Sequence, residues 1–140
     1  MSEYSDAIST WLQSTPWDYF FTITTRKARR DSVAFIRDVK AELLRGNQTQ
    51  KIFVACEPFK LNKDLHAHGL LLQGGQVDSD GSYRNTITTY NLWHDLFRRF
   101  GRSRVETINS RRQVANYCTK YVTKLTDGDN WNYFDLTDGV

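Results

Sequence analysis

The sequence contains little cysteine and proline and has no long hydrophobic run. Its 140 residues include two cysteines, Cys56 and Cys118, and both lie in apolar segments. Two such thiols do not support a disulfide scaffold or a zinc finger, and they are typical of buried, reduced cysteines in an intracellular protein. No segment approaches the roughly 20 apolar residues of a membrane span, and the polar N-terminus lacks the core of a signal peptide. We therefore expect a cytoplasmic protein that has no membrane partner.

The charge is nearly balanced overall but unevenly distributed. The net charge is +3, yet residues 98–124 carry eight basic residues and one acid, Glu106. A second basic cluster follows the first apolar run and comprises Arg26, Lys27, Arg29 and Arg30. Separated basic clusters favour a polyanionic partner over a membrane, because no long amphipathic basic helix accompanies them. The alternative is that both clusters are solvated charged surface without a partner.

Hydrophobic periodicity predicts alternating strands and helices. Runs rich in aromatic and β-branched residues predict strands at residues 17–25, 51–57, 64–72 and 102–108. Apolar residues at helical spacing predict helices at residues 32–45, 92–100 and 110–125. Residues 74–85 are rich in turn-forming residues and are predicted to be the longest loop.

The order of these elements is β-α-β-β-α-β-α, without internal repeats. This order predicts an α+β fold of the ferredoxin-like or split β-α-β kind, with a central antiparallel sheet and helices packed mainly on one face. Asp31 or Ser32 can cap the first helix, and Ser110 and Gln113 fit a capping box at the third. The length suits one domain, residues 1–140, with a core of about 17–125 and a peripheral extension at 126–140.

His66 and His68 lie one residue apart in the apolar run of the third predicted strand. Alternate residues of a strand point to the same face, so the two imidazoles can converge on one metal ion or phosphate. Glu57 ends the preceding strand, and antiparallel pairing would bring its carboxylate to that face. Such a donor set leaves coordination positions open and admits Mg²⁺ or Mn²⁺, of which Mn²⁺ tolerates imidazole better. The alternative is a pair of surface histidines, and the isolated His94 is predicted to be structural.

The third predicted helix contains the phrase Y-C-T-K-Y-V-T-K. Tyr117 and Tyr121 are four residues apart, and Lys120 and Lys124 repeat the interval. A separation of four stacks side chains on one helix face, so the two phenols would be presented together. This arrangement fits a nucleophile beside a cation that holds a phosphate, since a phenol with its usual pKa of about 10 needs such a neighbour to become reactive. The alternative is that both tyrosines are half-buried core residues on the apolar stripe of the helix.

Three motifs in this order resemble those of the HUH endonucleases, which include rolling-circle replication initiator (Rep) proteins, relaxases and transposases. The motifs are Phe20-Phe21-Thr22-Ile23-Thr24-Thr25, His66-Ala67-His68 and the stretch from Tyr117 to Lys124. The paired Y-x-x-K units are most similar to those of the two-tyrosine initiators of single-stranded DNA phages and some plasmids. The resemblance spans about residues 18–125. It implies a domain that nicks single-stranded DNA at a replication origin, holds the 5′ end as a phosphotyrosine and leaves a free 3′ hydroxyl.

The resemblance also implies roles for individual residues. By position, the metal ligands would be His66 and His68, the nucleophiles Tyr117 and Tyr121, and the lysines beside the scissile phosphate Lys120 and Lys124. Glu57 is a candidate for the third ligand, which varies in identity and position within the family. Many members carry a helicase domain that is not seen here, so a separate helicase is an expected partner, in the cytoplasm of the host cell if the protein is viral or plasmid-encoded. A trimmed or minimal initiator is the other explanation.

The residues support one leading hypothesis and two alternatives. The leading hypothesis is metal-dependent, sequence-specific nicking and joining of single-stranded DNA through a 5′-phosphotyrosine, as in rolling-circle replication initiation. The residues expected to contact the DNA backbone are Arg26, Lys27, Arg29, Arg30, Arg111 and Arg112. The first alternative is a non-catalytic nucleic-acid-binding module of similar fold. The second is a hydrolytic metal-dependent phosphodiesterase, in which water replaces the tyrosine.

Overall fold

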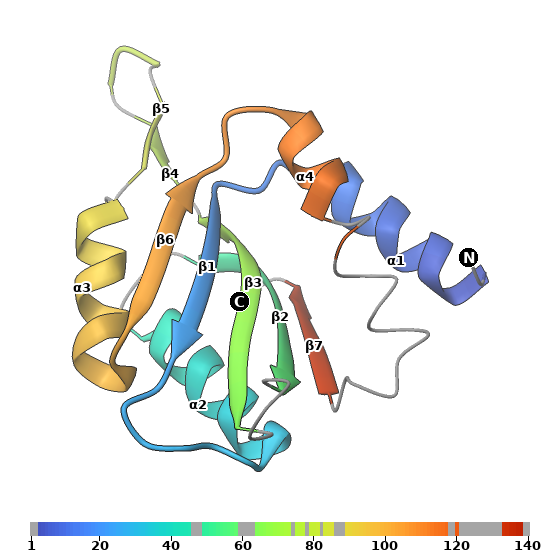
Figure 1. Cartoon of the computed structure of the whole chain (residues 1–140). Coiled ribbons are helices and arrows are strands. Elements are labelled where there is room, and N and C mark those ends of the chain that lie inside the picture. The colour runs from blue at the N-terminus through green and yellow to red at the C-terminus, as the bar shows by residue number, and fades with distance from the viewer. Residues whose placement is uncertain are drawn as a thin grey trace.

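Four strands coincide with the aromatic and β-branched runs of the sequence. They are β1 (Tyr19–Thr24), β2 (Thr49–Pro58), β3 (Leu65–Gln73) and β6 (Ser103–Thr107). In the computed structural model they pair antiparallel in the order β6-β1-β3-β2, and β7 (Tyr133–Asp138) pairs with the outer side of β2 (Figure 1). The predicted α+β fold with a central antiparallel sheet is confirmed.

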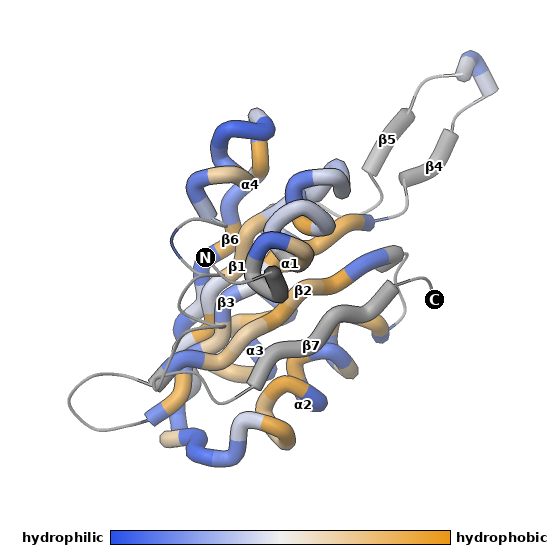
Figure 2. The backbone as a smooth tube through the Cα atoms, turned by 90° about the vertical axis from the view of Figure 1, so that its right-hand side faces the viewer, coloured by the Kyte–Doolittle hydropathy of each residue, from blue (hydrophilic) through white to orange (hydrophobic). Residues whose placement is uncertain are grey.

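The structure describes residues 3–45, 49–58, 64–73, 75–77, 79–81, 83–85, 89–117, 120 and 133–138. Within these ranges four helices accompany the sheet: α1 (Glu3–Ser14), α2 (Ser32–Leu44), α3 (Thr89–Phe100) and α4 (Arg111–Tyr117). The helices predicted between strands, α2 and α3, cover one face, whereas α1 and α4 lie on the other (Figure 2). None of the helices within these ranges has the length and apolarity that a membrane crossing requires.

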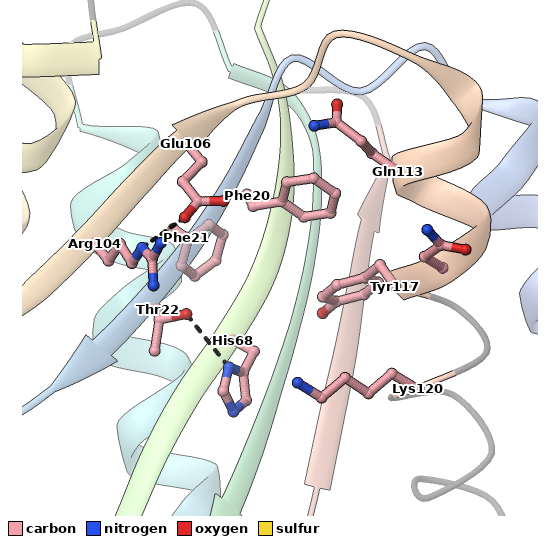
Figure 3. A pocket seen from close by; sticks show the side chains of 10 residues that line it. Phe20, Phe21, Thr22, His68, Arg104, Glu106, Gln113, Tyr117 and Lys120 are labelled. Carbon is pink, nitrogen blue, oxygen red and sulfur yellow. Dashed lines mark hydrogen bonds and ion pairs between the residues drawn. The ribbon is translucent and has the colours of Figure 1, made fainter.

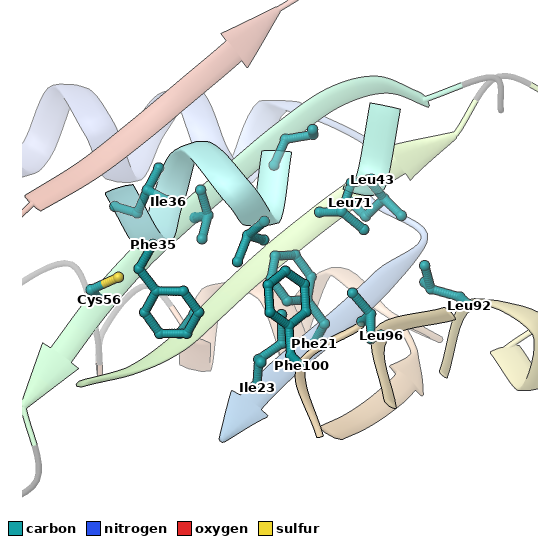
Figure 4. Packing of buried hydrophobic residues seen from close by; sticks show 14 of the residues in the cluster. Phe21, Ile23, Phe35, Ile36, Leu43, Cys56, Leu71, Leu92, Leu96 and Phe100 are labelled. Atoms are coloured by element: carbon teal, nitrogen blue, oxygen red, sulfur yellow. The ribbon is translucent and has the colours of Figure 1, made fainter. Parts of the chain in front are cut away.

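The α2/α3 face carries the larger apolar core. Burial alternates along β1, and Tyr19, Phe21 and Ile23 are the residues buried on this face. They pack in one cluster with Phe35 of α2 and Phe100 of α3, whose ring centroids lie 6.1 Å apart (Figure 4). Close packing of this kind fixes the three central strands against the two helices.

Gly69 makes room for a large ring where β1 and β3 meet. A Cβ atom at this position would collide with the Phe21 ring and with the carbonyl oxygen of Phe53. Phe21 and Gly69 are direct cross-strand partners, so the missing side chain is what admits the ring. The preceding residue, His68, points to the opposite face. The packing of the main core therefore fixes the backbone from which this histidine projects.

The α1/α4 face combines a smaller apolar core with a polar region. Its buried residues are Leu12, Trp17, Phe53, Ala55, Leu70, Val114 and Tyr117. The Trp17 indole N–H donates to the Leu12 carbonyl oxygen at 2.7 Å and so ties the end of α1 to the start of β1. Strand alternation places Thr22, Glu57, His66 and His68 on this same face. The polar side chains singled out in the sequence thus lie beside an apolar core and opposite the main one.

The helix ends follow the predicted capping residues. Asp31 caps α2, because its carboxylate accepts a hydrogen bond from the Ala34 N–H at 3.1 Å. At α4, the Gln113 N–H donates to Ser110 Oγ at 3.4 Å and Gln113 Oε1 accepts from the Ser110 N–H at 3.2 Å, which confirms the capping box. Helix α3 ends before Gly101, whose φ of +116° favours glycine.

Two segments differ from the expectation. Residues 74–85, predicted to be a loop, contain a hairpin of β4 (Gly75–Val77) and β5 (Tyr83–Asn85) that projects beyond the sheet (Figure 1). Each of these strands has three residues, which is too short for a periodic pattern to appear in the sequence. Residues 133–138, expected to belong to a peripheral extension, instead supply the sheet strand β7.

Candidate active site and metal centre

Three candidate metal ligands lie side by side on β2 and β3. In the antiparallel pairing of these strands, Glu57 is opposite His66, and Ala55 is opposite His68. Directly opposed residues point to the same face, so the carboxylate and both imidazoles project from the α1/α4 face. The structure thus brings the histidine pair and Glu57 together, as the strand pattern predicts.

The separations of the ligand atoms fit a shared divalent cation. Glu57 Oε2 lies 3.5 Å from His66 Nε2 and 3.3 Å from His68 Nε2, and one ligand atom from each residue lies within 4.8 Å of the others. Two atoms that each lie about 2.1 Å from one ion are about 3.0–3.4 Å apart when the angle at the ion is about 90–110°. Two imidazole nitrogens and a carboxylate oxygen suit Mn²⁺ and leave positions for substrate oxygens. The residues therefore fit a divalent cation.

Thr22 of β1 contacts the other ring nitrogen of His68. The two residues are cross-strand partners, and Thr22 Oγ1 lies 3.4 Å from His68 Nδ1. Because Nε2 faces Glu57, a proton on Nδ1 that is shared with Thr22 would leave the Nε2 lone pair for a cation. Sequence interpretation placed Thr22 in a motif but gave it no role. The pairing of β1 with β3, combined with strand alternation, is the signal that identifies it.

Tyr117 has a buried ring on the short helix α4. Its centroid lies 5.4 Å from that of Phe20 and 6.3 Å from that of Phe53, and the residue is 8% exposed. Val114 is the other buried residue of α4. The ring of Tyr117 is therefore a core element that attaches α4 to the sheet, as the alternative interpretation expected. That role leaves the hydroxyl group to be considered separately.

A pocket of about 360 Å³ lies between α4 and the edge strand β6 and joins Tyr117 to the histidines. It is lined by Phe20, Phe21, Thr22, His68, Arg104, Glu106, Gln113, Asn116, Tyr117 and Lys120. The hydroxyl of Tyr117 and the ammonium group of Lys120 both point toward the side of the pocket where His68 lies (Figure 3). A substrate group in this pocket can therefore contact a candidate nucleophile, a cation and a candidate metal ligand.

The second tyrosine and lysine of the motif, Tyr121 and Lys124, lie outside the residues that the structure describes. The same holds for Cys118 and for the predicted helix beyond residue 120. Of the first pair, Tyr117 is buried and Lys120 is exposed. The structural description of the motif therefore rests on its first half.

The basic residues expected to contact DNA lie at opposite ends of β1. Residues 26–30 follow its C-terminal end, whereas Arg111 and Arg112 begin α4, after β6 has paired its Thr107 with Tyr19 at the start of β1. Four of the six are exposed, namely Lys27, Arg30, Arg111 and Arg112, although Arg30 also pairs with Asp64 at 3.1 Å. A backbone that contacts both groups would have to run along β1, past the histidines.

Arg26 and Arg29 make intramolecular contacts that support the fold. The Arg26 guanidinium donates to the carbonyl oxygens of Phe97 and Arg98 at the end of α3, at 2.6 and 3.2 Å. Arg29 donates to Asp38 at 2.8 Å, and this hydrogen bond is the main cause of the lowered pKa of Asp38. An arginine already bound in this way has fewer donors for a phosphate. The expected DNA contacts of this cluster therefore rest mainly on Lys27 and Arg30.

Cys56 and His94 are not part of the site. Cys56 is next to Glu57 in the chain but points into the main core, where burial raises the pKa of its thiol to about 12. Such a thiol is protonated and unreactive at neutral pH, and the prediction that Cys56 is buried and reduced is confirmed. His94 is exposed on α3, on the other side of the sheet, and stacks on Tyr90 with ring centroids 6.2 Å apart.

Comparison with known proteins gives a match over most of the chain. The model of a family described as replication-associated protein ORF2 matches residues 18–126. The matched region starts at β1 and extends past α4, so it contains Glu57, His66, His68 and Tyr117. No curated protein matches the chain.

Proposed function

Because the chain belongs to this family of replication-associated proteins, we propose that it initiates DNA replication by nicking and rejoining single-stranded DNA. We further propose an enzyme of the HUH type, which acts at a rolling-circle origin through a 5′-phosphotyrosine intermediate. The observation that carries this proposal is that Tyr117, Lys120 and His68 line one pocket. A phosphodiester in that pocket would meet a nucleophile and a cation beside the candidate metal ligands.

In the proposed cleavage, the phenolic oxygen of Tyr117 attacks the scissile phosphorus. A new bond joins the tyrosine oxygen to phosphorus on the 5′ side of the break, while the bond from phosphorus to the 3′ oxygen is broken. The phenol proton passes to solvent, and the departing 3′ oxygen takes up a proton to become a hydroxyl. Rejoining is the reverse reaction, in which a DNA 3′ hydroxyl attacks the phosphotyrosine and releases the phenol.

The residues around the pocket would position the reacting groups. The ring contacts with Phe20 and Phe53 restrain Tyr117, so its hydroxyl is presented to the pocket in one orientation. Lys120 places a positive charge on the same wall and attracts the phosphate. Glu57, His66 and His68 would hold Mn²⁺ or Mg²⁺, which supplies Lewis-acid polarisation of the phosphate when it is bound.

The proposal includes a second nucleophile, Tyr121, and its companion Lys124. Two tyrosines would allow a second cleavage before the first covalent DNA end is released, which strand transfer requires. Exposed basic residues at both ends of β1 would hold the DNA backbone, and a separate helicase would unwind the duplex. This arrangement makes single-stranded DNA at a replication origin the expected substrate.

The decisive experiment is covalent capture. The purified full chain is incubated with Mn²⁺ and a 3′-labelled pool of random single-stranded DNA, and the products are separated on a denaturing gel. A random pool contains every short recognition sequence, so the origin need not be known. We expect a labelled protein–DNA adduct that is lost in the Tyr117→Phe, Tyr121→Phe double variant and in excess chelator. The matched control is Tyr90→Phe, because Tyr90 is 66% exposed on a helix that covers the other face.

The same gel separates the competing functions. Adducts that persist in the double variant would contradict the tyrosine mechanism. Shortened DNA with a 5′ phosphate but no adduct would indicate hydrolysis by water. Binding without any cleavage would indicate a nucleic-acid-binding module.

A further inference from the structure

The pocket between α4 and β6 extends beyond the groups that the proposed cleavage uses. Thr22 pairs with both His68 and Arg104, whereas Phe20, two residues earlier in β1, pairs with Glu106. Two residues along a strand span about 6.8 Å, so the pocket has a second end at Phe20 and Glu106 (Figure 3). Its volume of about 360 Å³ lies in the range of about 300–1,000 Å³ that is typical of pockets for small organic molecules. A phosphate group alone would leave most of this space empty.

We propose that the second end of the pocket holds the base of a nucleotide next to the scissile phosphate, and that Arg104 and Glu106 select this base. This inference rests on the proposed function, because the phosphate in front of Tyr117 defines which base is adjacent. Neither residue was singled out by the sequence motifs. Both reach the site because β6 is the partner of β1 on the side away from β3.

The aromatic side chains at this end provide a surface on which a base can stack. Phe20 is half-buried, and its ring is tilted by 35° to the Tyr117 ring at a centroid distance of 5.4 Å. Aromatic side chains of this kind stack on nucleobases in many single-strand-binding proteins. A base against Phe20 would also lie close to the attacking phenol, so its fit could affect the position of the phosphate.

The charges at the two ends of the pocket differ and favour a base at the second end. Lys120 and His68 stand at the first end, where a phosphate is attracted. The carboxylate of Glu106 stands at the second end and repels a phosphate but accepts hydrogen bonds from base amino and imino groups. The second end therefore suits a neutral group with N–H donors better than another part of the DNA backbone.

Arg104 and Glu106 retain hydrogen-bonding groups for a base. Arg104 Nε lies 2.5 Å from Glu106 Oε1, and the two side chains are 79% and 49% exposed. An ion pair this exposed contributes little to stability, so its arrangement is available for recognition. Arginine most often recognises guanine, and glutamate accepts from the cytosine amino group. We therefore expect guanine or cytosine at the selected position.

The amide residues on the α4 side of the pocket play a smaller part. Gln113 Oε1 accepts from the N–H groups of Asn109 and Ser110, at 2.5 and 3.2 Å, so its carboxamide is held by the helix cap. Asn116 is half-buried and lines the pocket, but it lies on the helix opposite the strand pair. Arg104 and Glu106 are therefore the residues to change first.

The test is sequencing of the DNA captured by each variant. Full-length wild type, Arg104→Ala and Glu106→Gln are incubated with Mn²⁺ and the random single-stranded pool, and both the covalently held and the released fragments are sequenced. Base frequencies are normalised within each sample, so the yield of each variant does not enter. We expect a wild-type preference of at least about fivefold for guanine or cytosine at one position beside the break, consistent with the discrimination of a good base contact. In both variants this preference should disappear while preferences at other positions persist.

The controls match the charge changes at a distance from the pocket. Arg37→Ala and Glu42→Gln lie on α2, which covers the other face, and should leave every base preference unchanged. If wild type captures DNA but Arg104→Ala and Glu106→Gln keep the wild-type preference at all positions, the base pocket is wrong and the proposed nicking function stands. If wild type captures no DNA, the proposed function fails and this inference fails with it. Loss of preference at every position at once would also overturn it, because a general disturbance of the site is then responsible.

Discussion

The two interpretations of Tyr117, core residue and nucleophile, predict different results for two substitutions. Tyr117→Phe removes the hydroxyl but keeps the ring between Phe20 and Phe53. The loss of one hydrogen-bonding group typically costs about 0.5–1.5 kcal/mol of the free energy of unfolding. Tyr117→Ala removes the ring as well, and truncation of a buried aromatic residue costs about 3–5 kcal/mol. The first variant therefore isolates the chemistry of the hydroxyl from the packing of the ring.

The expected loss in Tyr117→Ala is large relative to the whole domain. Domains have free energies of unfolding of about 5–15 kcal/mol, and α4 has only Val114 and Tyr117 as buried residues. Urea denaturation, followed by tryptophan fluorescence and circular dichroism, measures both variants. Tyr90→Phe and Tyr90→Ala serve as controls, because Tyr90 is 66% exposed and its truncation should change stability by no more than about 0.5 kcal/mol.

Adduct formation is then measured in a Tyr121→Phe background, so that the second tyrosine cannot replace the first. We expect Tyr117→Phe to remain folded and to form no adduct. An adduct from this double variant would show that the hydroxyl of Tyr117 is not the nucleophile. Equal losses of stability in Tyr117→Phe and Tyr117→Ala would refute the packing argument, since the ring would then contribute nothing.

Three further predictions concern the metal centre, the DNA contacts and the fold. Thr22→Val should weaken Mn²⁺ binding by about tenfold, as measured by isothermal titration calorimetry, whereas Thr24→Val on the same strand face should not; equal affinities would contradict the orienting contact to the imidazole. The Arg111→Ala, Arg112→Ala double variant should bind single-stranded DNA with a slope of log K against log salt that is about 1.4 shallower, since each phosphate contact contributes about 0.7; an unchanged slope would mean that neither arginine contacts a phosphate. Asp38→Asn should lower the free energy of unfolding at pH 7 by up to about 1 kcal/mol, because its arginine hydrogen bond lowers the pKa of this carboxylate in the folded state. The difference should shrink as the pH falls below 3.8, where the wild-type carboxylate becomes protonated, and a difference that does not depend on pH would contradict the assigned cause.

Sequence patterns predicted the elements whose periodicity is strong. The alternation in β1, the apolar stripe of α2 and the cap at Asp31 all appear in the structure. Helix α1 was missed because it is mostly polar, with Leu12 as its fully buried contribution to the core. Strand β7 was missed because it depends on pairing with β2, which is distant in the chain, and a local pattern carries no information about such a partner.

The candidate site was predictable where it follows from strand geometry. The spacing of His66 and His68 placed both on one face, and the end of the preceding strand placed Glu57 across from them. The contact of Thr22 and the position of Arg104 were not predictable, because both depend on β1 lying between β3 and β6. Sheet order is set by long-range packing rather than by local sequence, so residues of the site that come from neighbouring strands emerge only from the fold.

Strand β7 also protects the sheet from self-association. Its pairing satisfies the outer backbone groups of β2 from Lys51 to Cys56, a stretch in which Ile52 to Cys56 are all buried. Without β7, this long apolar strand would become an exposed edge, and exposed edges of that kind are templates for pairing with another chain and for aggregation. A segment that lies outside the proposed chemistry therefore helps to keep the strand that carries Glu57 from becoming an aggregation site.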